Sequence, residues 1–313
     1  MQIWRSLADI PGDLGRTAVV IGNFDGVHLG HQHVVREARA AADADGLRVV
    51  AVTFDPHPMA VLRPEHAPTT ITDLETRAEL LRAAGVDDVV ALPFDRDVAS
   101  WSPHEFAVRV LTRALHAAVV VVGANFRYGS KASGDVATLA ASGKELGFRA
   151  VGVPLDGDPQ VWSSTYVRAC LAAGDVAGAA QALGRPFVVR GVVVRGDQRG
   201  RGLGFPTANV PAGTLTTVPA DGVYAGWLRR LDTGERFPAA ISVGSNPTFD
   251  GARERRVESY VLDRDDLELY DVEVEVSFVD RIRGMVRFDG VEALVETMRD
   301  DVRRARKVLR RPA

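Results

Sequence analysis

The chain has 313 residues, a formal net charge of −3 at pH 7 and one cysteine. That cysteine, Cys170, excludes an intramolecular disulfide and any multi-cysteine zinc or iron–sulfur site, and we interpret it as a small buried filler of a helix. The small net charge gives no global reason to expect binding to nucleic acid or to a membrane surface. A length of this size favours two domains.

We expect neither a signal peptide nor a membrane-spanning segment. The N-terminus lacks the basic start and apolar core of a signal peptide, and no apolar run approaches the roughly 20 residues of a membrane-spanning helix. The basic C-terminal run RRARKVLRR follows an acidic helical stretch and is more typical of a solvated helix face than of a nucleic-acid-binding arm. We therefore expect a cytoplasmic protein with no nucleic-acid or membrane partner.

The first half of the chain alternates short apolar runs with helical patterns. Continuous β-branched runs of this kind are typical of strands that are covered on both faces. Residues 102–116 read as a helix with a capping box, because Ser102 and Pro103 precede Glu105. Strand–helix alternation predicts an α/β domain with a doubly wound parallel sheet, which binds ligands at the carboxyl ends of its strands. The predicted strands are residues 17–22, 48–54, 87–94, 117–123 and 148–154.

The pattern changes near residues 183–186. Beyond this point several runs alternate apolar and polar residues, and only one clear helix, residues 290–311, follows. This pattern predicts a small antiparallel β-barrel with a terminal α-helix. We therefore expect one domain over residues 1–184 and a second over residues 185–313. The predicted strands of the second domain are residues 187–196, 222–231, 237–245, 256–263 and 270–283.

The loop GNFDGVHLGHQ, residues 22–32, joins the first predicted strand to a helix. It is neither a GxGxxG nor a Walker motif. His28 and His31 lie near the start of the helix, where free backbone N–H groups favour anions, so they suit donation to phosphate oxygens. A metal pair is the weaker alternative, because the local sequence shows no third ligand, and ordinary capping is another; His33 reads as a surface residue.

A second short motif, SSTYVR, starts another predicted helix. It places Ser164 and Thr165 at the helix start and Arg168 one turn later. Hydroxyls, free N–H groups and a guanidinium on one side suit a triphosphate. By itself the motif is weak, because Ser or Thr before a helix is usually only a cap.

Taken together, these motifs resemble the nucleotidylyltransferase superfamily, which transfers a nucleotide from a nucleoside triphosphate through a Rossmann-like fold. The segments TFDPHP and GANFRYG narrow the resemblance to the adenylyltransferase module of bacterial FAD synthetases. The resemblance implies ATP binding by the loop and motif residues, with a catalytic role for both histidines and the arginine: Gly22, Asn23, Phe24, Asp25, His28, His31, Asn125, Ser164, Thr165 and Arg168. Tyr128 stands where a phenylalanine is common. The predicted flavin side, each member of which could equally belong to the core, is Phe54, His57, Pro58 and Tyr128.

A glycine-rich segment, RGDQRGRGLGFPTANV, spans residues 195–210. Such glycine density is typical of a backbone that wraps a ligand closely, although a long hairpin loop is the plainer alternative. Thr207 and Asn209 offer oxygen ligands for a hard cation such as Mg²⁺ held with phosphates. Further along, Glu258 lies in a strand-like run, where it is either a general base or a surface carboxylate paired with Arg255 or Arg256.

The motifs GxGFPTAN, NPTF and ESYVLD resemble the riboflavin kinase family, a small β-barrel with a C-terminal helix. The resemblance covers roughly residues 187–309 and implies that Thr207 and Asn209 contact the metal and ATP and that Glu258 is the base. The order of the two modules is that of bifunctional prokaryotic FAD synthetases. The kinase residues that we expect to contact ATP or flavin are Gly200, Gly202, Gly204, Phe205, Pro206, Thr207, Asn209 and Glu258.

The predicted function is therefore the synthesis of both flavin cofactors. One ATP phosphorylates riboflavin to FMN, and a second adenylylates FMN to FAD with release of pyrophosphate; Mg²⁺ is the expected metal. Two rivals remain, a nucleotidyltransferase for a different acceptor and a flavin-binding storage protein. The substrates riboflavin, FMN and ATP are the predicted partners, and the sequence leaves a monomer and a homo-oligomer both open.

Overall fold

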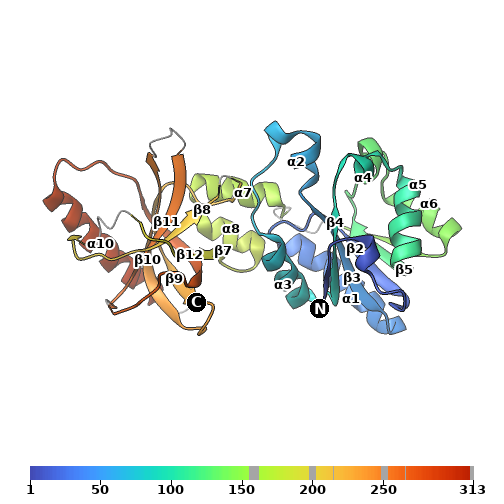
Figure 1. The fold of residues 1–313 in the computed structure, drawn as a ribbon, viewed down its shortest axis with the longest axis horizontal. Helices are drawn as coiled ribbons and strands as arrows, with labels where there is room; N and C mark the ends of the chain where they lie inside the picture. Colours follow the sequence, from blue (N-terminus) through green and yellow to red (C-terminus); the bar gives the residue numbers. More distant parts are fainter. Residues whose placement is uncertain (155–161, 197–201, 214, 248–252, 265, 311–313) are drawn as a thin grey trace. The chain divides into compact units, whose positions relative to one another are not determined.

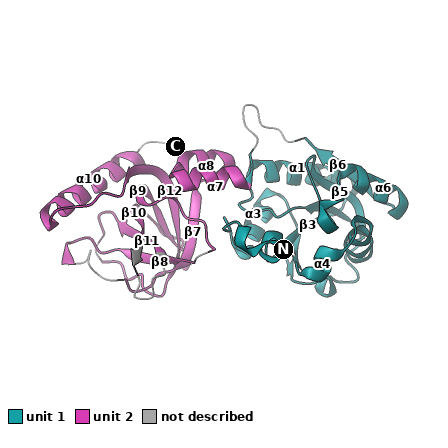
Figure 2. Ribbon diagram, turned by 90° about the horizontal axis from the view of Figure 1, so that it is seen from above, with its two compact units in different colours: residues 1–163 teal, residues 164–313 magenta. Residues whose placement is uncertain are grey.

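The computed structural model describes residues 1–154, 162–196, 202–213, 215–247, 253–264 and 266–310. The chain forms two compact units, residues 1–163 and residues 164–313, which Figure 2 colours teal and magenta. Each unit has its own six-stranded sheet.

Unit 1 contains a parallel sheet with the strand order β1-β4-β3-β2-β5-β6 (Figure 1). All five strands that the apolar runs predict are present. The sheet adds a two-residue edge strand near the N-terminus, which is too short to give a sequence signal. The strands are β1 (Ile3–Trp4), β2 (Thr17–Ile21), β3 (Arg48–Asp55), β4 (Asp88–Pro93), β5 (Ala117–Gly123) and β6 (Arg149–Val153).

Helices connect these strands. The helix predicted over residues 102–116 forms as an α-helical turn that continues into a π-helical segment, and the Glu105 N–H donates to Ser102 Oγ at 3.1 Å, as expected of a cap. The α-helices are α1 (Leu29–Asp45), α2 (Pro58–Leu62), α3 (Leu74–Ala84), α4 (Arg96–Ser100), α5 (Pro103–Phe106) and α6 (Val136–Leu146). The π-helical segment is η3 (Ala107–Ala114), and the 3₁₀ turns are η1 (Leu7–Asp9), η2 (Pro64–His66) and η4 (Ser130–Ala132).

Both faces of the parallel sheet are buried, because successive residues of a strand point to opposite sides. Val19 and Ile21 of β2 belong to a core cluster with residues of α5, η3 and α6. Ala18 and Val20 belong to the other cluster, with residues of α1 and α3. Figure 1 shows the sheet between these two helical layers. Two-sided coverage explains why the strands read as continuous apolar runs.

The strand order reverses between β2 and β5. From β2 the chain passes to β3 on one side and later returns to β5 on the other side. In an open parallel sheet, ligands bind at the carboxyl ends of the strands at such a reversal. The loop that starts at Gly22 and the segment that contains Asn125 directly follow β2 and β5, so the fold brings both predicted motifs to that edge.

Unit 2 contains an antiparallel sheet with the strand order β7-β12-β9-β10-β11-β8. A backbone bridge joins Val194, two residues beyond the end of β7, to Asn209 of β8, because the Val194 N–H donates to the Asn209 carbonyl at 2.9 Å. The predicted small barrel is thus confirmed as a nearly closed one. The strands are β7 (Phe187–Val192), β8 (Ala208–Ala212), β9 (Gly222–Arg230), β10 (Arg236–Pro247), β11 (Arg253–Val261) and β12 (Glu273–Gly284).

Two helices, α7 (Ser164–Ala173) and α8 (Val176–Leu183), precede the barrel and pack with it. The Ala220 N–H donates to the Leu171 carbonyl at 2.8 Å, and Arg281 Nη1 donates to the Ala173 carbonyl at 3.0 Å. The compact unit therefore begins at Ser164, ahead of the boundary that we predict at residues 184 and 185.

The C-terminal helix α10 (Val291–Leu309) lies against β9, β10 and β12. A buried ion pair anchors it: the Arg283 guanidinium donates to both carboxylate oxygens of Asp301, at 2.7 to 3.1 Å, and Asp301 is 5% exposed. Removing one partner of such a pair leaves a buried charge without compensation.

We expect Asp301→Asn to lower the free energy of unfolding of unit 2 by about 3 kcal/mol. Asp300→Asn is the matched control, because Asp300 pairs on the helix surface with Arg303 and Arg304, and exposed pairs contribute about 1 kcal/mol or less. Amide hydrogen exchange of β9 and β12 peptides measures both changes. Equal effects of the two variants would contradict this reading of the buried pair.

Candidate active sites

The loop after β2, residues 22–28, has a tightly constrained backbone. Phe24 and Val27 adopt positive φ angles of 49° and 41°, and Gly26 lies at 81°. Positive φ is unfavourable for a β-branched residue such as valine, so it persists only where the surroundings hold the backbone in place. This strain points to a loop whose shape matters for function.

Asp25 supplies much of that restraint. Its side chain is buried, with 1% exposure for the residue, and its carboxylate accepts the N–H groups of Ile71 and Thr72 at 2.9 to 3.1 Å. The Gly26 N–H in turn donates to Thr72 Oγ1 at 3.0 Å. Asp25 therefore ties the loop to residues 71–72, and its predicted contact with ATP stays a prediction.

His28 and His31 lie together at the start of α1. His28 is the N-cap, and its Nδ1 accepts the His31 N–H at 3.4 Å. The two rings stack with their centroids 3.6 Å apart. The Nδ1 atom of His31 is buried and has no hydrogen-bond partner among the described residues.

The protonation state of His31 follows from its surroundings. Burial, the neighbouring His28 and the Arg77 cation together lower the pKa of His31 well below its usual value. The ring is therefore neutral at pH 7 in the ligand-free protein. A bound polyphosphate would favour the charged imidazolium and would reverse this shift.

The residues after β3 approach the same loop. His57 is the N-cap of α2, its Nδ1 accepts the Met59 N–H at 3.1 Å, and its Nε2 lies 3.2 Å from the Asn23 amide nitrogen. Phe54 is half-buried and makes an edge contact with Phe94. The structure thus brings His57, with Pro58 next to it in the chain, to the edge of the β2 loop.

After β5, the predicted residues divide between surface and core. Asn125 is exposed, whereas Tyr128 is buried in the core cluster that includes Phe106, and its ring stacks on the half-buried Phe126. Burial in an apolar environment raises the pKa of the Tyr128 phenol. Tyr128 occupies the core position that the sequence left open, and its contact with flavin stays a prediction.

The SSTYVR motif forms the start of α7, as predicted, with Ser164 as its first residue and Arg168 one turn further on. This helix belongs to unit 2, whereas the histidines belong to unit 1. The convergence of Arg168 with His28 and His31 on one triphosphate stays a prediction.

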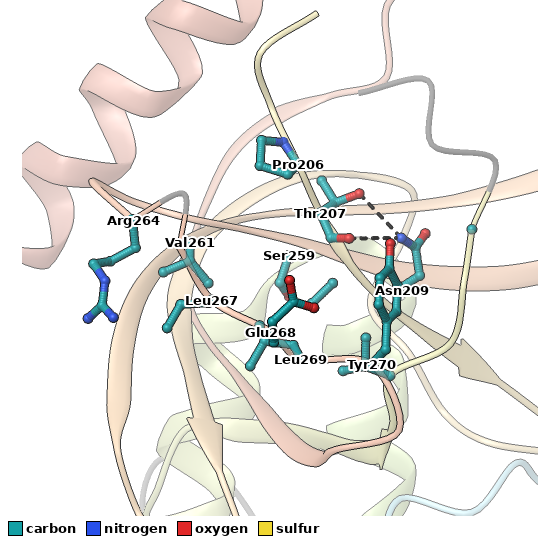
Figure 3. Close-up of a pocket in the computed structure, with 13 residues that line it drawn as sticks. Pro206, Thr207, Asn209, Ser259, Val261, Arg264, Leu267, Glu268, Leu269 and Tyr270 are labelled. Atoms are coloured by element: carbon teal, nitrogen blue, oxygen red, sulfur yellow. Dashed lines mark hydrogen bonds between the residues drawn. The ribbon is translucent and has the colours of Figure 1, made fainter. Parts of the chain in front are cut away.

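In the barrel, three predicted kinase residues come together. Glu258 of β11 lies directly opposite Asn209 of β8. Opposed residues of an antiparallel pair project from the same face, with Cβ atoms about 5 Å apart. Asn209 Nδ2 also donates to the carbonyl and the hydroxyl oxygen of Thr207, at 3.1 and 3.3 Å (Figure 3). The strand register therefore sets these residues in one cluster.

The cluster fits a hard divalent cation. A threonine hydroxyl and an asparagine amide are oxygen donors of the kind that Mg²⁺ accepts together with phosphate oxygens. The Asn209 amide lies against Gly196, where an added Cβ would lie 2.6 Å from Asn209 Oδ1. Glycine at position 196 is thus required to leave the amide of Asn209 in place.

Within the glycine-rich segment, residues 197–201 lie outside the described residues, and Gly200 is one of them. Gly204 has a φ of 85°, a conformation that favours glycine, and Phe205 packs edge-to-face on Tyr260 of β11 with ring centroids 5.2 Å apart. This aromatic contact holds the end of the segment against the strand that carries Glu258.

A pocket opens beside this cluster (Figure 3). Pro206, Thr207 and Asn209 form one side of it, and Val261 and Leu269 are among its apolar walls. Asn209 both lines the pocket and lies opposite Glu258. The pocket therefore adjoins the predicted phosphate-transfer groups.

Sequence reasoning missed two residues near these sites. Arg77 of α3 is 6% exposed and donates to Thr53 and Thr72 beside the β2 loop. Ser259 is fully buried, lines the barrel pocket, and its Oγ has no partner among the described residues. The sequence offered little indication of either residue, because Arg77 is an arginine in a helical pattern and Ser259 is a small polar residue next to Glu258.

Two kinds of feature are absent from the described part of the chain. No three His, Cys, Asp or Glu side chains there gather as a candidate metal group. No described helix is both long enough and apolar enough to cross a bilayer.

Comparison with known proteins agrees with this division into two sites. Residues 11–165 match the family model described as FAD synthetase, and residues 183–309 match the one described as riboflavin kinase. Fold and sites thus define a flavin adenylyltransferase joined to a flavin kinase. The chain belongs to the family of bifunctional riboflavin kinases/FMN adenylyltransferases.

Individual relatives cover nearly the whole chain. The bifunctional riboflavin kinase/FMN adenylyltransferase of Listeria monocytogenes is 35% identical over 90% of this chain and 89% of the relative. That of Haemophilus influenzae is 34% identical over 98% of both chains. A crystal structure titled macrolide-efflux protein, from Streptococcus pneumoniae, has a TM-score of 0.86 and 33% identity over 97% of this chain and 98% of that one. The activity named in that title belongs to the description of the Streptococcus protein and is not extended to this chain.

Proposed function

We propose that the chain makes FMN from riboflavin in its barrel and FAD from FMN at the loop after β2. We assign residues 1–184 to adenylyl transfer and residues 185–313 to phosphorylation, which places α7 and its motif with the first activity. The observation that carries the kinase half is the register that sets Glu258 opposite Asn209. The stacked histidine pair at a helix start carries the other half.

In the kinase reaction Glu258 acts as the general base. Its carboxylate takes the proton of the riboflavin 5′-hydroxyl, and the hydroxyl oxygen attacks the γ-phosphorus of ATP. The bond from that phosphorus to the β–γ bridging oxygen breaks, and ADP leaves. Catalysis here rests on positioning and on charge stabilisation.

Thr207 and Asn209 hold the divalent metal that accompanies ATP, which we propose to be Mg²⁺. When bound, the metal neutralises charge on the phosphates. Gly202, Gly204, Phe205 and Pro206 shape the backbone around the nucleotide. The pocket beside them, with apolar walls and a buried hydroxyl at Ser259, suits a planar heterocycle of the substrates.

In the adenylyl transfer reaction the FMN phosphate attacks the α-phosphorus of ATP. The bond between that phosphorus and the α–β bridging oxygen breaks, and pyrophosphate leaves. No protein nucleophile is needed, because the attacking phosphate is already ionised. His28 and His31 donate to the phosphates, and Arg168, Ser164 and Thr165 complete the cradle.

The remaining residues of this site have supporting roles. Gly22, Asn23, Phe24 and Asp25 shape the loop backbone around ATP, and Asn125 contacts it from the end of β5. The flavin of FMN lies against residues that follow β3 and β5: Phe54, His57, Pro58 and Tyr128.

One experiment tests the whole proposal. The purified chain is incubated with riboflavin, ATP and Mg²⁺, and the flavins are resolved by chromatography; both FMN and FAD are expected. FMN without FAD, even when FMN is supplied, would favour a nucleotidyltransferase for another acceptor beside the kinase. Flavin that binds while ATP is not consumed would instead identify a storage protein.

Binding of ATP at the first site should take up a proton. His31 is neutral in the free protein because its pKa is lowered, and bound phosphates raise that pKa. The affinity for ATP should therefore increase as pH falls through the pKa of the complex. Calorimetry at pH 6.5 in buffers of different ionisation enthalpy measures the uptake, and His31→Asn should remove it. Equal uptake by the two proteins would refute the phosphate contact.

A further inference from the structure

Arg77 is a buried cation on α3, next to the loop after β2. It is 6% exposed, and its guanidinium makes two hydrogen bonds: Nη1 donates to Thr53 Oγ1 and Nη2 donates to the Thr72 carbonyl, each at 3.2 Å. Burying an arginine is costly unless its donors and its charge find partners. Its position therefore calls for a physical reason.

Each partner of Arg77 holds a different part of the loop. The Thr53 hydroxyl donates to the Asn23 carbonyl at 3.0 Å. Because Arg77 occupies an acceptor position of that hydroxyl, the hydroxyl hydrogen is directed to Asn23. In this way the guanidinium fixes the start of the loop through one side chain.

The other partner fixes the middle of the loop. Thr72 donates its N–H to the Asp25 carboxylate at 3.0 Å, and its hydroxyl accepts the Gly26 N–H at the same distance. The bond from Arg77 to the Thr72 carbonyl thus holds the segment on which Asp25 and Gly26 rest. The Arg77 guanidinium therefore connects Thr53 and Thr72, the two residues that hold the loop. This loop contains two non-glycine residues with positive φ angles.

Charge complements this geometry. Burial lowers the pKa of Arg77, while the nearby carboxylates of Asp25, Asp55 and Asp73 act in the opposite direction, and an arginine remains protonated in such a setting. The groups whose charge acts on His31 are His28, at the N-cap of the same helix, and Arg77 from α3. Arg77 thus also contributes a positive potential at the histidine pair.

We propose that Arg77 is a positioning residue for adenylyl transfer: it holds the loop after β2 in the shape that aims His28 and His31 at the phosphates of ATP, without touching the substrates. The inference rests on the proposed role of those histidines. Arginine is needed because a planar fork reaches Thr53 and Thr72 at once, whereas a lysine offers a single ammonium.

The test compares Arg77→Met and Arg77→Lys with Arg82→Met, a matched control that removes an exposed arginine from the same helix. We expect Arg77→Met to lower kcat/KM for ATP in FMN adenylylation by about 100-fold, because small displacements of aligned groups have effects of this size. Arg77→Lys should fall between Arg77→Met and the wild type. Arg82→Met, and the riboflavin kinase activity of every variant, should stay within about twofold of the wild type.

A second readout separates positioning from loss of folding. Nitrogen-15 NMR titration of the His31 ring should give a higher pKa in Arg77→Met than in Arg82→Met, because a nearby cation has been removed. If unit 1 of Arg77→Met does not fold, the positioning role of Arg77 is tested with Thr53→Val and Arg77→Lys instead. Thr53→Val keeps the shape of the side chain and removes only the hydroxyl that links Arg77 to Asn23, and it should lower kcat/KM by about tenfold.

Near-wild-type adenylylation in Arg77→Lys and Thr53→Val, or in a folded Arg77→Met, would overturn the inference. Failure of the histidine proposal is distinguishable, because it would show as FAD formation that survives loss of both His28 and His31. If the double histidine variant is inactive in FAD formation while the Arg77 variants are active, only the role of Arg77 is wrong.

Discussion

Replacing both His28 and His31 by alanine is expected to lower FAD formation by about 1000-fold, while FMN continues to accumulate from riboflavin. The reason is the loss of two hydrogen-bond donors to phosphate oxygens, in a reaction that uses no protein nucleophile. Loss of one such donor alone lowers the rate by about 100-fold or more. The measurement is chromatographic separation of FMN and FAD in time courses with riboflavin, ATP and Mg²⁺.

The control for this double variant is His33→Ala, which removes a half-buried histidine from the same helix and should leave both activities near wild type. The single variants are informative as well. Because the rings of His28 and His31 stack on each other, each single loss should disturb its neighbour, so the two effects should not add. Loss of FMN formation in the folded double variant would show that the division of labour is wrong.

Glu258→Ala is expected to have the opposite effect. Riboflavin phosphorylation should fall by about 1000-fold, within the range for removal of a general base, whereas supplied FMN should still be converted to FAD. The two activities are therefore measured in the same preparation, one with riboflavin and one with FMN as the starting flavin.

Two further variants define what Glu258 does. Glu258→Gln keeps the size of the side chain and removes its basicity, so it should be nearly as inactive as alanine if proton transfer is the role. Glu273→Ala removes an exposed barrel carboxylate that pairs with Arg190 on the surface, and it should retain kinase activity. A glutamine variant with full activity would assign Glu258 to binding or to structure.

The sequence was sufficient for the architecture because both sheets follow simple burial rules. Strands that are covered on two faces must be apolar throughout, as in Val19 to Ile21, whereas the barrel strand that contains Val274 and Val276 alternates between core and exterior. The parallel and antiparallel halves could therefore be told apart, and two different family models match them, one over residues 11–165 and the other over residues 183–309.

The sequence was less informative where a side chain depends on distant partners. Asp25 reads as a loop carboxylate that is free to meet a ligand, yet its partners, Ile71 and Thr72, lie 46 and 47 residues further along the chain. Arg77 reads as an ordinary helix residue for the same reason. Glu258 and Asn209 are 49 residues apart, and only strand register makes them neighbours. Local spacing cannot indicate contacts that the fold creates.

Asn209 has two structural roles, because its main chain forms the bridge to Val194 and its side chain lines the pocket. The main chain of Asn209 fastens the seam of the barrel, and its side chain faces the place where we expect nucleotide and metal. We expect occupancy of the kinase site and closure of the barrel to be thermodynamically linked, because a ligand that binds the amide of Asn209 would also stabilise the bridge to Val194. We therefore expect bound substrate to stabilise the closed form of the barrel.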